Sequence, residues 1–343
     1  MSNRSRIHFA LYGKRSIAAA VSLLMGCAGE SVTGPSVTSA VKHETSPCPC
    51  TYVANYGGNS ITVYPVSANG NVAPIRRLYG SNTGLHYPFG VAVDASGNLY
   101  VANGEGGSQN LGDILIFAPN ARGNVAPIAV ISGPNTQVSG PAGIALDPVN
   151  GDIYIVNENG GLASPPPYIT SYSAGSNGNV TPLATIEGSN TQLSRPQGVA
   201  LDLSENIYVA NELSSTITIF AAGSVGNVSP AGVISGSNTK LANPYPVALD
   251  SASNLYVGSG NQILTYAAGA NGNVRPIRTV HGNNTKLPQS VRGLALDAKN
   301  NMYATGLERV TSYPAGSNGN VAATTIIQGG KTQLNEPWGI AVH

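Results

Sequence analysis

Charged and aromatic residues are scarce in this sequence, and cysteine and tryptophan are nearly absent. Charged residues make up only 10% of the 343 residues, and no cluster of Lys and Arg is large enough to neutralise a nucleic-acid backbone. The three cysteines, Cys27, Cys48 and Cys50, are too few for a disulfide-rich scaffold. Glycine is abundant, with 42 residues, and most glycines fall where turns between short strands are expected.

The first 26 residues have the pattern of an export signal. Four basic residues lie within the first 15 positions, and the apolar run 17–25 that follows is too short to span a membrane as a mature helix. The sequence therefore predicts an exported protein whose signal peptide covers residues 1–26.

A lipidation site is predicted at the end of this signal. Leu24-Met25-Gly26-Cys27 resembles the bacterial lipobox, in which the cysteine is lipidated and becomes the mature N-terminus. Ala28 in the next position implies sorting to the outer membrane of a two-membrane bacterium. Residues 28–47 are small and polar, so residues 27–49 are expected to be a lipidated cysteine and a flexible linker. The alternative is ordinary secretory cleavage, with Cys27 incidental.

Export changes the charge balance and the chemistry expected of Cys48 and Cys50. Removing the four basic signal residues from the 17 leaves 13 against 16 acidic residues, a net charge near −3, which argues against a nucleic-acid partner. A disulfide across the single residue Pro49 would be strained, and two thiols without supporting histidines are a weak metal signal. Pairing with another chain and two unmodified thiols at a domain edge both stay open.

Six copies of one repeat fill residues 50–343. The tripeptide Gly-Asn-Val recurs every 46–55 residues, and each copy also carries strands like those of residues 88–103, PFGVAVDASGNLYVAN. That stretch predicts a hairpin of two short strands around an Asp/Ser/Gly turn, and two further strand signals follow it. Neither strand alternates between apolar and polar residues, so both faces of the sheet should be covered. Four strands in a repeat of this length are typical of a β-propeller blade.

One repeat is divided between the two ends of the domain. Residues 338–343 supply a first strand with no second strand after it, and the missing second strand is residues 51–55. A linear solenoid has no use for this division, whereas a ring gains from it because pairing the two ends removes a free sheet edge. The sequence predicts an all-β, six-bladed β-propeller with four antiparallel strands per blade, closed by the N-terminal strands pairing with the C-terminal strand.

The hairpin resembles the NHL repeat, whose pattern runs Pro-x-Gly-Ile-Ala-Val-Asp, a Gly-Asn turn, and Ile-Tyr-Val-Ala-Asp. Pro88, Gly90, Asp94, Asn98 and Tyr100 are among the matching residues, and the resemblance covers all six repeats. The Gly-Asn-Val elements also resemble those of bacterial envelope lipoproteins. The resemblance implies the propeller fold and little about activity, because propellers carry many unrelated functions.

One position changes from repeat to repeat, where packing alone would tend to keep the same residue. It directly precedes the glycine that opens each first strand, so in a propeller these residues ring the mouth of the central channel. Aromatic, amide and guanidinium groups there suit a polar ligand with flat apolar faces, such as a glycan or a peptide. The candidate ligand-binding residues are Phe89, Gln197, Tyr245, Arg292 and Trp338, with Ala142 in the remaining repeat. The alternative is that each side chain packs on its neighbouring loop.

A second ring consists of asparagines that end second strands, where NHL repeats usually have Asp. These are Asn55, Asn103, Asn157 and Asn211. Glu105, Glu158, Glu212 and Glu308 lie in loops between second and third strands. Such oxygens suit Ca²⁺, an ion that the resemblance to six-bladed propeller lactonases also implies. The candidate metal ligands are Asn103, Asn157, Glu158, Asn211 and Glu212. The alternative is that each asparagine caps its own turn, and no other cofactor is expected.

The sequence predicts no catalytic residue. It has no Gly-x-Ser-x-Gly motif and no P-loop, and His86, His281 and His343 occupy non-equivalent positions, unlike the three-His zinc site of NHL-type lyases. We therefore expect an envelope lipoprotein that binds a glycan, a peptide or an envelope protein through one propeller face and touches the membrane only through its anchor. The alternative is a hydrolase, such as a lactonase, or a lyase that uses Ca²⁺ or Zn²⁺ in the channel.

Overall fold

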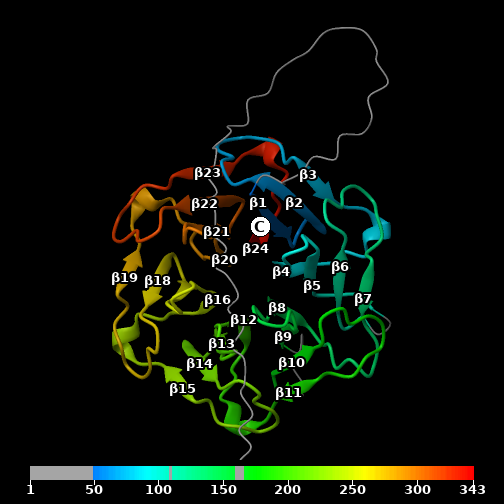
Figure 1. The fold of residues 1–343 in the computed structure, drawn as a ribbon. Helices are drawn as coiled ribbons and strands as arrows, with labels where there is room; N and C mark the ends of the chain where they lie inside the picture. Colours follow the sequence, from blue (N-terminus) through cyan, green and yellow to red (C-terminus); the bar gives the residue numbers. More distant parts are fainter. Residues whose placement is uncertain (1–48, 108–109, 159–165) are drawn as a thin grey trace, which may run out of the picture. The chain divides into compact units, whose positions relative to one another are not determined.

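Each repeat of the sequence folds into a four-stranded antiparallel sheet. In the computed structural model, which describes residues 49–107, 110–158 and 166–343, six such sheets stand around a central axis as the blades of a propeller (Figure 1). The predicted fold class is therefore confirmed. The predicted signal peptide, the lipidated Cys27 and the linker up to residue 47 lie outside the described residues.

The first strand of each blade lies nearest the axis and the fourth lies at the rim (Figure 1). Blades 1 to 5 follow the chain order: β4–β7 (Pro88–Val93, Leu99–Asn103, Asp113–Phe117, Ala129–Ile131), β8–β11 (Pro141–Leu146, Ile153–Asn157, Tyr168–Tyr172, Ala184–Ile186), β12–β15 (Pro196–Leu201, Ile207–Asn211, Thr216–Phe220, Gly232–Ile234), β16–β19 (Pro244–Leu249, Leu255–Ser259, Gln262–Tyr266, Arg278–Val280) and β20–β23 (Gly293–Leu296, Met302–Gly306, Arg309–Tyr313, Thr325–Gln328). The closing blade consists of β24 (Pro337–Val342), β1 (Cys50–Asn55), β2 (Ser60–Pro65) and β3 (Arg76–Leu78).

Short 3-10 helices precede the first strands of five blades in the described part of the chain. They are η1 (Ser81–Thr83), η2 (Ser189–Thr191), η3 (Ser237–Thr239), η4 (Asn283–Thr285) and η5 (Gly330–Thr332). No helix among the described residues has the length and apolar character needed to cross a membrane.

Packing between neighbouring blades explains why the inner strands are apolar on both faces. β5 has the sequence LYVAN and is buried at every position. Its Val101 belongs to a core cluster with Tyr52 of the closing blade, whereas its Ala102 belongs to a cluster with Ile155 of blade 2. The core is thus a series of layers between blades, as the lack of alternation in the sequence predicts.

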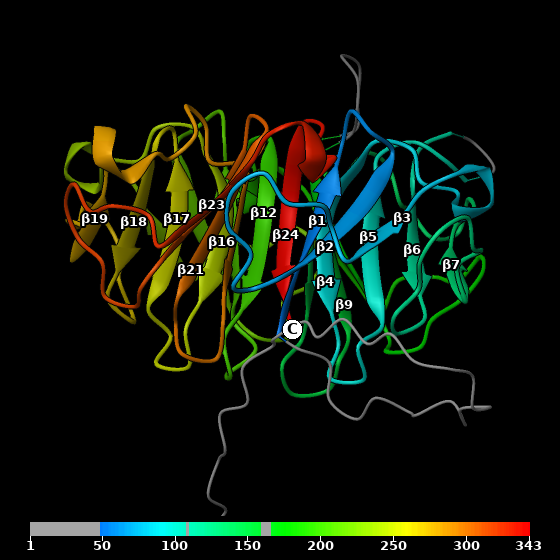
Figure 2. The same ribbon diagram turned by 90° about the horizontal axis from the view of Figure 1, so that it is seen from above.

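The two ends of the propeller meet in one sheet. β24 pairs antiparallel with β1, with Thr51 opposite Val342 and Val53 opposite Ile340. Cys50 and His343 exchange backbone hydrogen bonds of 2.7 and 3.0 Å, so the predicted closure of the ring is confirmed. Figure 2 shows the C-terminus at the lower face, which places Cys50 there as well, whereas the start of β24 lies at the opposite, upper face.

The six Gly-Asn-Val segments, which we call the clasps, connect each blade to the outer strand of the blade before it. Their glycines form parallel bridges to the fourth strand of that blade, at Gly70–Ile327, Gly123–Leu78, Gly178–Ile131, Gly226–Ile186, Gly272–Ile234 and Gly319–Val280. Each asparagine side chain accepts a hydrogen bond of 2.7–2.8 Å from a backbone N–H in the loop that follows that strand. These clasps cover the outer strand edges, which would otherwise be free to pair with another chain.

Candidate functional site

At the glycines near the start of the first strands, neighbouring strands approach so closely around the axis that a Cβ atom does not fit between them. A Cβ atom on Gly90 would lie 2.6 Å from the carbonyl oxygen of Ala142, and one on Gly143 would lie 2.5 Å from that of Gln197. The strands therefore leave a narrow channel of about 90 Å³. A β-bulge between Pro88 and Val91 releases Phe89 from regular pairing, and bulges recur at this place in blades 2, 3 and 4.

All five candidate ligand-binding residues lie at the upper mouth of this channel. Gln197, Tyr245, Arg292 and Trp338 line it together with Ala142, and Phe89 contacts the Trp338 ring. Gln197 and Ala142 are buried, whereas the three aromatic residues and Arg292 are half-buried and keep part of their surface open to solvent.

Aromatic rings cover one side of the mouth. The Trp338 ring lies 4.9 Å from Phe89 and 6.0 Å from Tyr245 between ring centroids, both edge to face. The guanidinium carbon of Arg292 lies 4.3 Å from the centre of the Trp338 ring, a cation–π contact. Tyr56 adds a further ring, 5.0 Å from Phe89 and 5.4 Å from Trp338. We call Tyr56, Phe89, Tyr245, Arg292 and Trp338 the aromatic platform.

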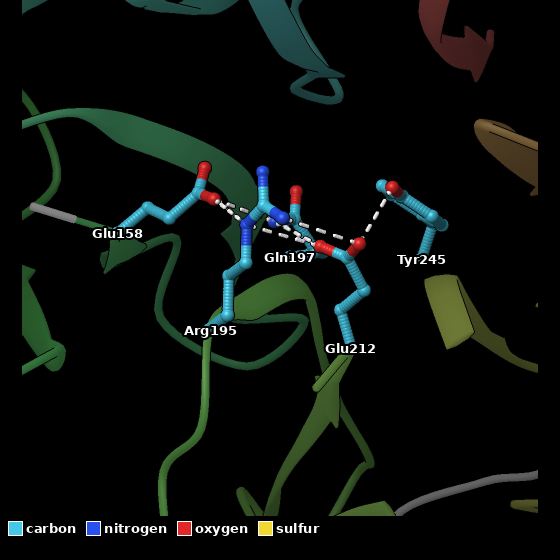
Figure 3. Close-up of polar contacts among 5 residues, drawn as sticks. All are labelled: Glu158, Arg195, Gln197, Glu212 and Tyr245. Carbon is cyan, nitrogen blue, oxygen red and sulfur yellow. Dashed lines mark hydrogen bonds and ion pairs between the residues drawn. The ribbon is translucent and has the colours of Figure 1, made fainter. Parts of the chain in front are cut away.

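A charged network lies beside this platform (Figure 3). Arg195 stands between two carboxylates, with its Nε 2.5 Å from Oε1 of Glu158 and 3.2 Å from Oε2 of Glu212. Gln197 donates through Nε2 to both, at 2.9 and 3.2 Å, and the Tyr245 hydroxyl donates to Oε1 of Glu212 at 2.9 Å. Tyr245 therefore belongs to both the network and the aromatic platform.

The contacts of the network raise the pKa of both Tyr245 and Arg195. Burial, together with the hydrogen bond to Glu212, raises the pKa of the Tyr245 hydroxyl to about 12, so this group stays a donor at physiological pH. The hydrogen bond to Glu158 raises the pKa of Arg195. Glu212 is nearly buried, with 7% of its side chain exposed, whereas Arg195 is 49% exposed and presents its outer edge to solvent.

Three residues of the mouth were missed by the sequence reasoning: Tyr56, Tyr87 and Arg195. Tyr87 stacks at 4.8 Å on Tyr56. Tyr87 and Arg195 precede the proline that opens the first strand, and both have a left-handed backbone, with φ of 51° and 52°. The equivalent residue of blade 2 is Gly140, which adopts φ of 57° without strain. This position also varies between repeats, which was a usable signal for finding it.

The asparagine ring serves the fold. Its four members are fully buried. Each Oδ1 accepts a hydrogen bond of 2.6–3.1 Å from a backbone N–H in the loop that leads into the same blade. Asn103 also caps its own turn, because its Nδ2 donates to the carbonyl oxygen of Glu105 at 2.7 Å. The Nδ2 groups donate to Thr62, Thr170 and Thr218 or, in blade 1, to Asp113. These amides therefore do not fit the proposed calcium site.

Glu158 and Glu212 of the second ring come together around Arg195 and Gln197, and Glu105 does not join them. Glu158 and Glu212 are engaged with Arg195, and Glu105 pairs with His86 at 2.9 Å in blade 1. Within the described ranges, no group of three or more His, Cys, Asp or Glu side chains is arranged to hold a metal ion.

Comparisons with known proteins bear on the fold alone. No family model matches the chain, and no curated protein shows significant sequence similarity to it, so the resemblance to NHL repeats stays unconfirmed. A protein of unknown function from Bacteroides caccae is 13% identical, with a TM-score of 0.62 over 86% of this chain and 99% of that one. A chain of the nidogen/laminin complex is 16% identical, with a TM-score of 0.56 over 86% and 98%. A streptogramin B lyase is 14% identical, with a TM-score of 0.54 over 84% and 82%.

Proposed function

We propose that this protein is a cell-envelope lipoprotein that binds a glycan or a peptide on the upper face of its propeller. The observation that supports this most strongly is the aromatic platform with the charged network beside it. Flat apolar rings bind the faces of sugar rings or side chains, while adjacent donors and acceptors bind their polar groups. All five side chains of the aromatic platform are only half-buried, although the close packing of the first strands requires only the glycines that follow Phe89, Arg292 and Trp338.

Backbone strain supports the same face. Tyr87, Arg195, Asn243 and Glu336 all hold left-handed φ values of 48–52° at equivalent positions on the loops above the first strands. A non-glycine residue in this region costs about 1 kcal/mol or more, and such strain concentrates at functional sites. Because fourteen other described non-glycine residues also have positive φ, this strain supports the site only together with the aromatic platform.

Trp338 provides the test, because it is the only tryptophan of the chain. We expect glycan and peptide arrays to identify a ligand for the purified full chain, and that ligand to change the Trp338 fluorescence on titration. Tyr245→Ala should weaken binding at least tenfold, since it removes a ring and a donor to Glu212. Leu183→Ala removes an exposed apolar side chain beside the outer strand β11, away from the platform, and serves as the control. Wild-type protein that binds nothing on either array would contradict the proposal.

A second candidate is a metal-dependent hydrolase or lyase acting in the channel. It is favoured by the likeness in fold to a streptogramin B lyase. Because the asparagine amides are occupied, Glu158 and Glu212 would be the remaining candidate ligands. Stoichiometric Ca²⁺ or Zn²⁺ in elemental analysis of the purified protein would favour this candidate over a binding module.

The proposed anchor is tested separately. Incorporation of a labelled fatty acid, abolished by Cys27→Ser, would support lipidation, and cofractionation with outer membranes would support the proposed location. A chain that carries no label and is recovered free of membranes would contradict both.

A further inference from the structure

The outer wall of the closing blade carries arginines that the proposed function does not use. Arg76 and Arg77 lie on β3, the outermost strand of this blade, and Arg122 lies in the Gly-Asn-Val clasp that covers β3. Together with Ile75 and Tyr79 they line an open groove of about 740 Å³. Three of the eight arginines among the described residues therefore meet in one place, in a chain with a mature net charge near −3. We call this the arginine groove.

The guanidinium groups of Arg76 and Arg77 donate only to neutral side chains. Arg76 donates to Oδ1 of Asn120 at 2.5 Å and to the Tyr52 hydroxyl at 3.1 Å, and the hydrogen bond from Arg77 to Gln333 is 3.3 Å long. The Nε atoms of Arg76 and Arg77 are buried without a hydrogen-bond partner. None of the ion pairs in the described part of the chain involves Arg76, Arg77 or Arg122. A guanidinium group without a carboxylate partner is available to an external anion.

The other blades show that the fold does not require an arginine at these positions. The residues equivalent to Arg77 are Val130, Thr185, Val233, Thr279 and Ile326. Four of the five residues equivalent to Arg122 are asparagines, namely Asn69, Asn177, Asn271 and Asn318. Their Oδ1 atoms accept a hydrogen bond of 2.9 Å from the backbone N–H of the fourth strand they cover. An arginine side chain has no hydrogen-bond acceptor, so this hydrogen bond to the fourth strand is absent where Arg122 covers β3 of the closing blade.

We propose that the arginine groove binds an oxyanion, namely a phosphate group or a phosphate ester. The planar guanidinium donates two parallel hydrogen bonds to phosphate oxygens, and none of these three arginines makes such a pair with a carboxylate of the described chain. Tyr79 lies under Arg77, with 4.9 Å between the guanidinium carbon and the ring centre, and is 50% exposed. Tyr79 and Ile75 offer an apolar surface to the organic part of an ester.

Calorimetric titration of the purified full chain with inorganic phosphate tests the groove. We expect wild-type protein to bind phosphate and Arg122→Asn to weaken this binding at least tenfold. This variant introduces the residue that four other blades carry, so it should keep or raise the melting temperature. Lys299→Ala removes an exposed positive charge from the turn after β20 and is the charge-matched control, with unchanged affinity expected.

Vesicles distinguish a soluble phosphate ester from a lipid headgroup. Cosedimentation with phosphatidylglycerol vesicles but not phosphatidylcholine vesicles, lost in Arg122→Asn, would identify an anionic headgroup as the source. Binding of inorganic phosphate without vesicle binding would identify a soluble phosphate ester. Wild-type protein that binds neither probe, or Arg122→Asn that binds both as wild type does, would overturn the proposal.

Discussion

Asp113 shows how one substitution within a repeat alters the chemistry of its blade. In three other blades the buried asparagine that ends the second strand donates to a threonine hydroxyl of the third strand. Blade 1 has Leu115 at the threonine position, and Asn103 donates at 2.8 Å to the carboxylate of Asp113 instead. Asp113 is only 5% exposed, and burial raises its pKa to about 6 although hydrogen bonds from Asn103 and Gly107 oppose the shift.

This raised pKa predicts a pH dependence of stability. Between about pH 6 and pH 4 the folded chain keeps a proton on Asp113 that the unfolded chain has already released, so stability increases as the pH falls through this window. Above pH 6 the charged carboxylate should lower the unfolding free energy by about 3 kcal/mol relative to the protonated form. Asp113→Asn keeps an acceptor for Asn103 and should remove this dependence, as urea unfolding at pH 5 and pH 7.5 would show. An unchanged difference between the two pH values would contradict the pKa assignment.

The candidate site was predictable only where repeats can be compared residue by residue. Phe89, Tyr245 and Trp338 stood out because equivalent positions differ, and the structure brings them together at one mouth. Arg195 and Glu212 were not linked from sequence, because their contact depends on the three-dimensional path of two loops. The role of the asparagine ring was hidden for the same reason, since its partners lie in a different loop.

At the scale of the element, the strands were predictable and the clasps were not. The strands follow from local β-forming residues and Asp-containing turns, so short windows of sequence suffice. Gly-Asn-Val is as regular as the hairpin, but its partners lie in the blade before it, as in the bridge between Gly226 and Ile186. A regular motif with no local role thus marks a contact between repeats.

The clasps predict a measurable contribution to stability. Oδ1 of Asn227 accepts a hydrogen bond of 2.8 Å from the backbone N–H of Asn190, so Asn227→Ala should lower the unfolding free energy by about 1 kcal/mol. Ser229→Ala changes an exposed residue of the same loop and is the control, with no effect expected. Equal urea midpoints for the two variants would show that the asparagine side chain is not part of the clasp.

At the scale of the whole molecule, the ring has two unlike faces. The described chain enters at Cys50 and ends at His343, both on the lower face, whereas the aromatic platform lies on the upper face (Figure 2). Cys50 and His343 therefore lie on the side opposite the candidate ligand site.

Closure of the ring by β24 predicts that the propeller depends on its last seven residues. A chain ending at Glu336 loses the burial of Ile340 and the pairing of β24 with β1, which should cost on the order of 5 kcal/mol and leave β1 as an open edge. We expect this chain to melt at a lower temperature and to self-associate.

A peptide of residues 337–343, added in trans, should restore the ring by pairing with β1. The truncated chain has no tryptophan, so the fluorescence of Trp338 in the peptide reports its insertion without background. The emission should shift to shorter wavelength as the ring of Trp338 packs on Phe89 and Tyr245. A peptide with Ile340→Asp should not insert, because a charge would enter the buried position between β1 and the neighbouring blade. A truncated chain as stable as the full one would show that closure by β24 does not stabilise the propeller.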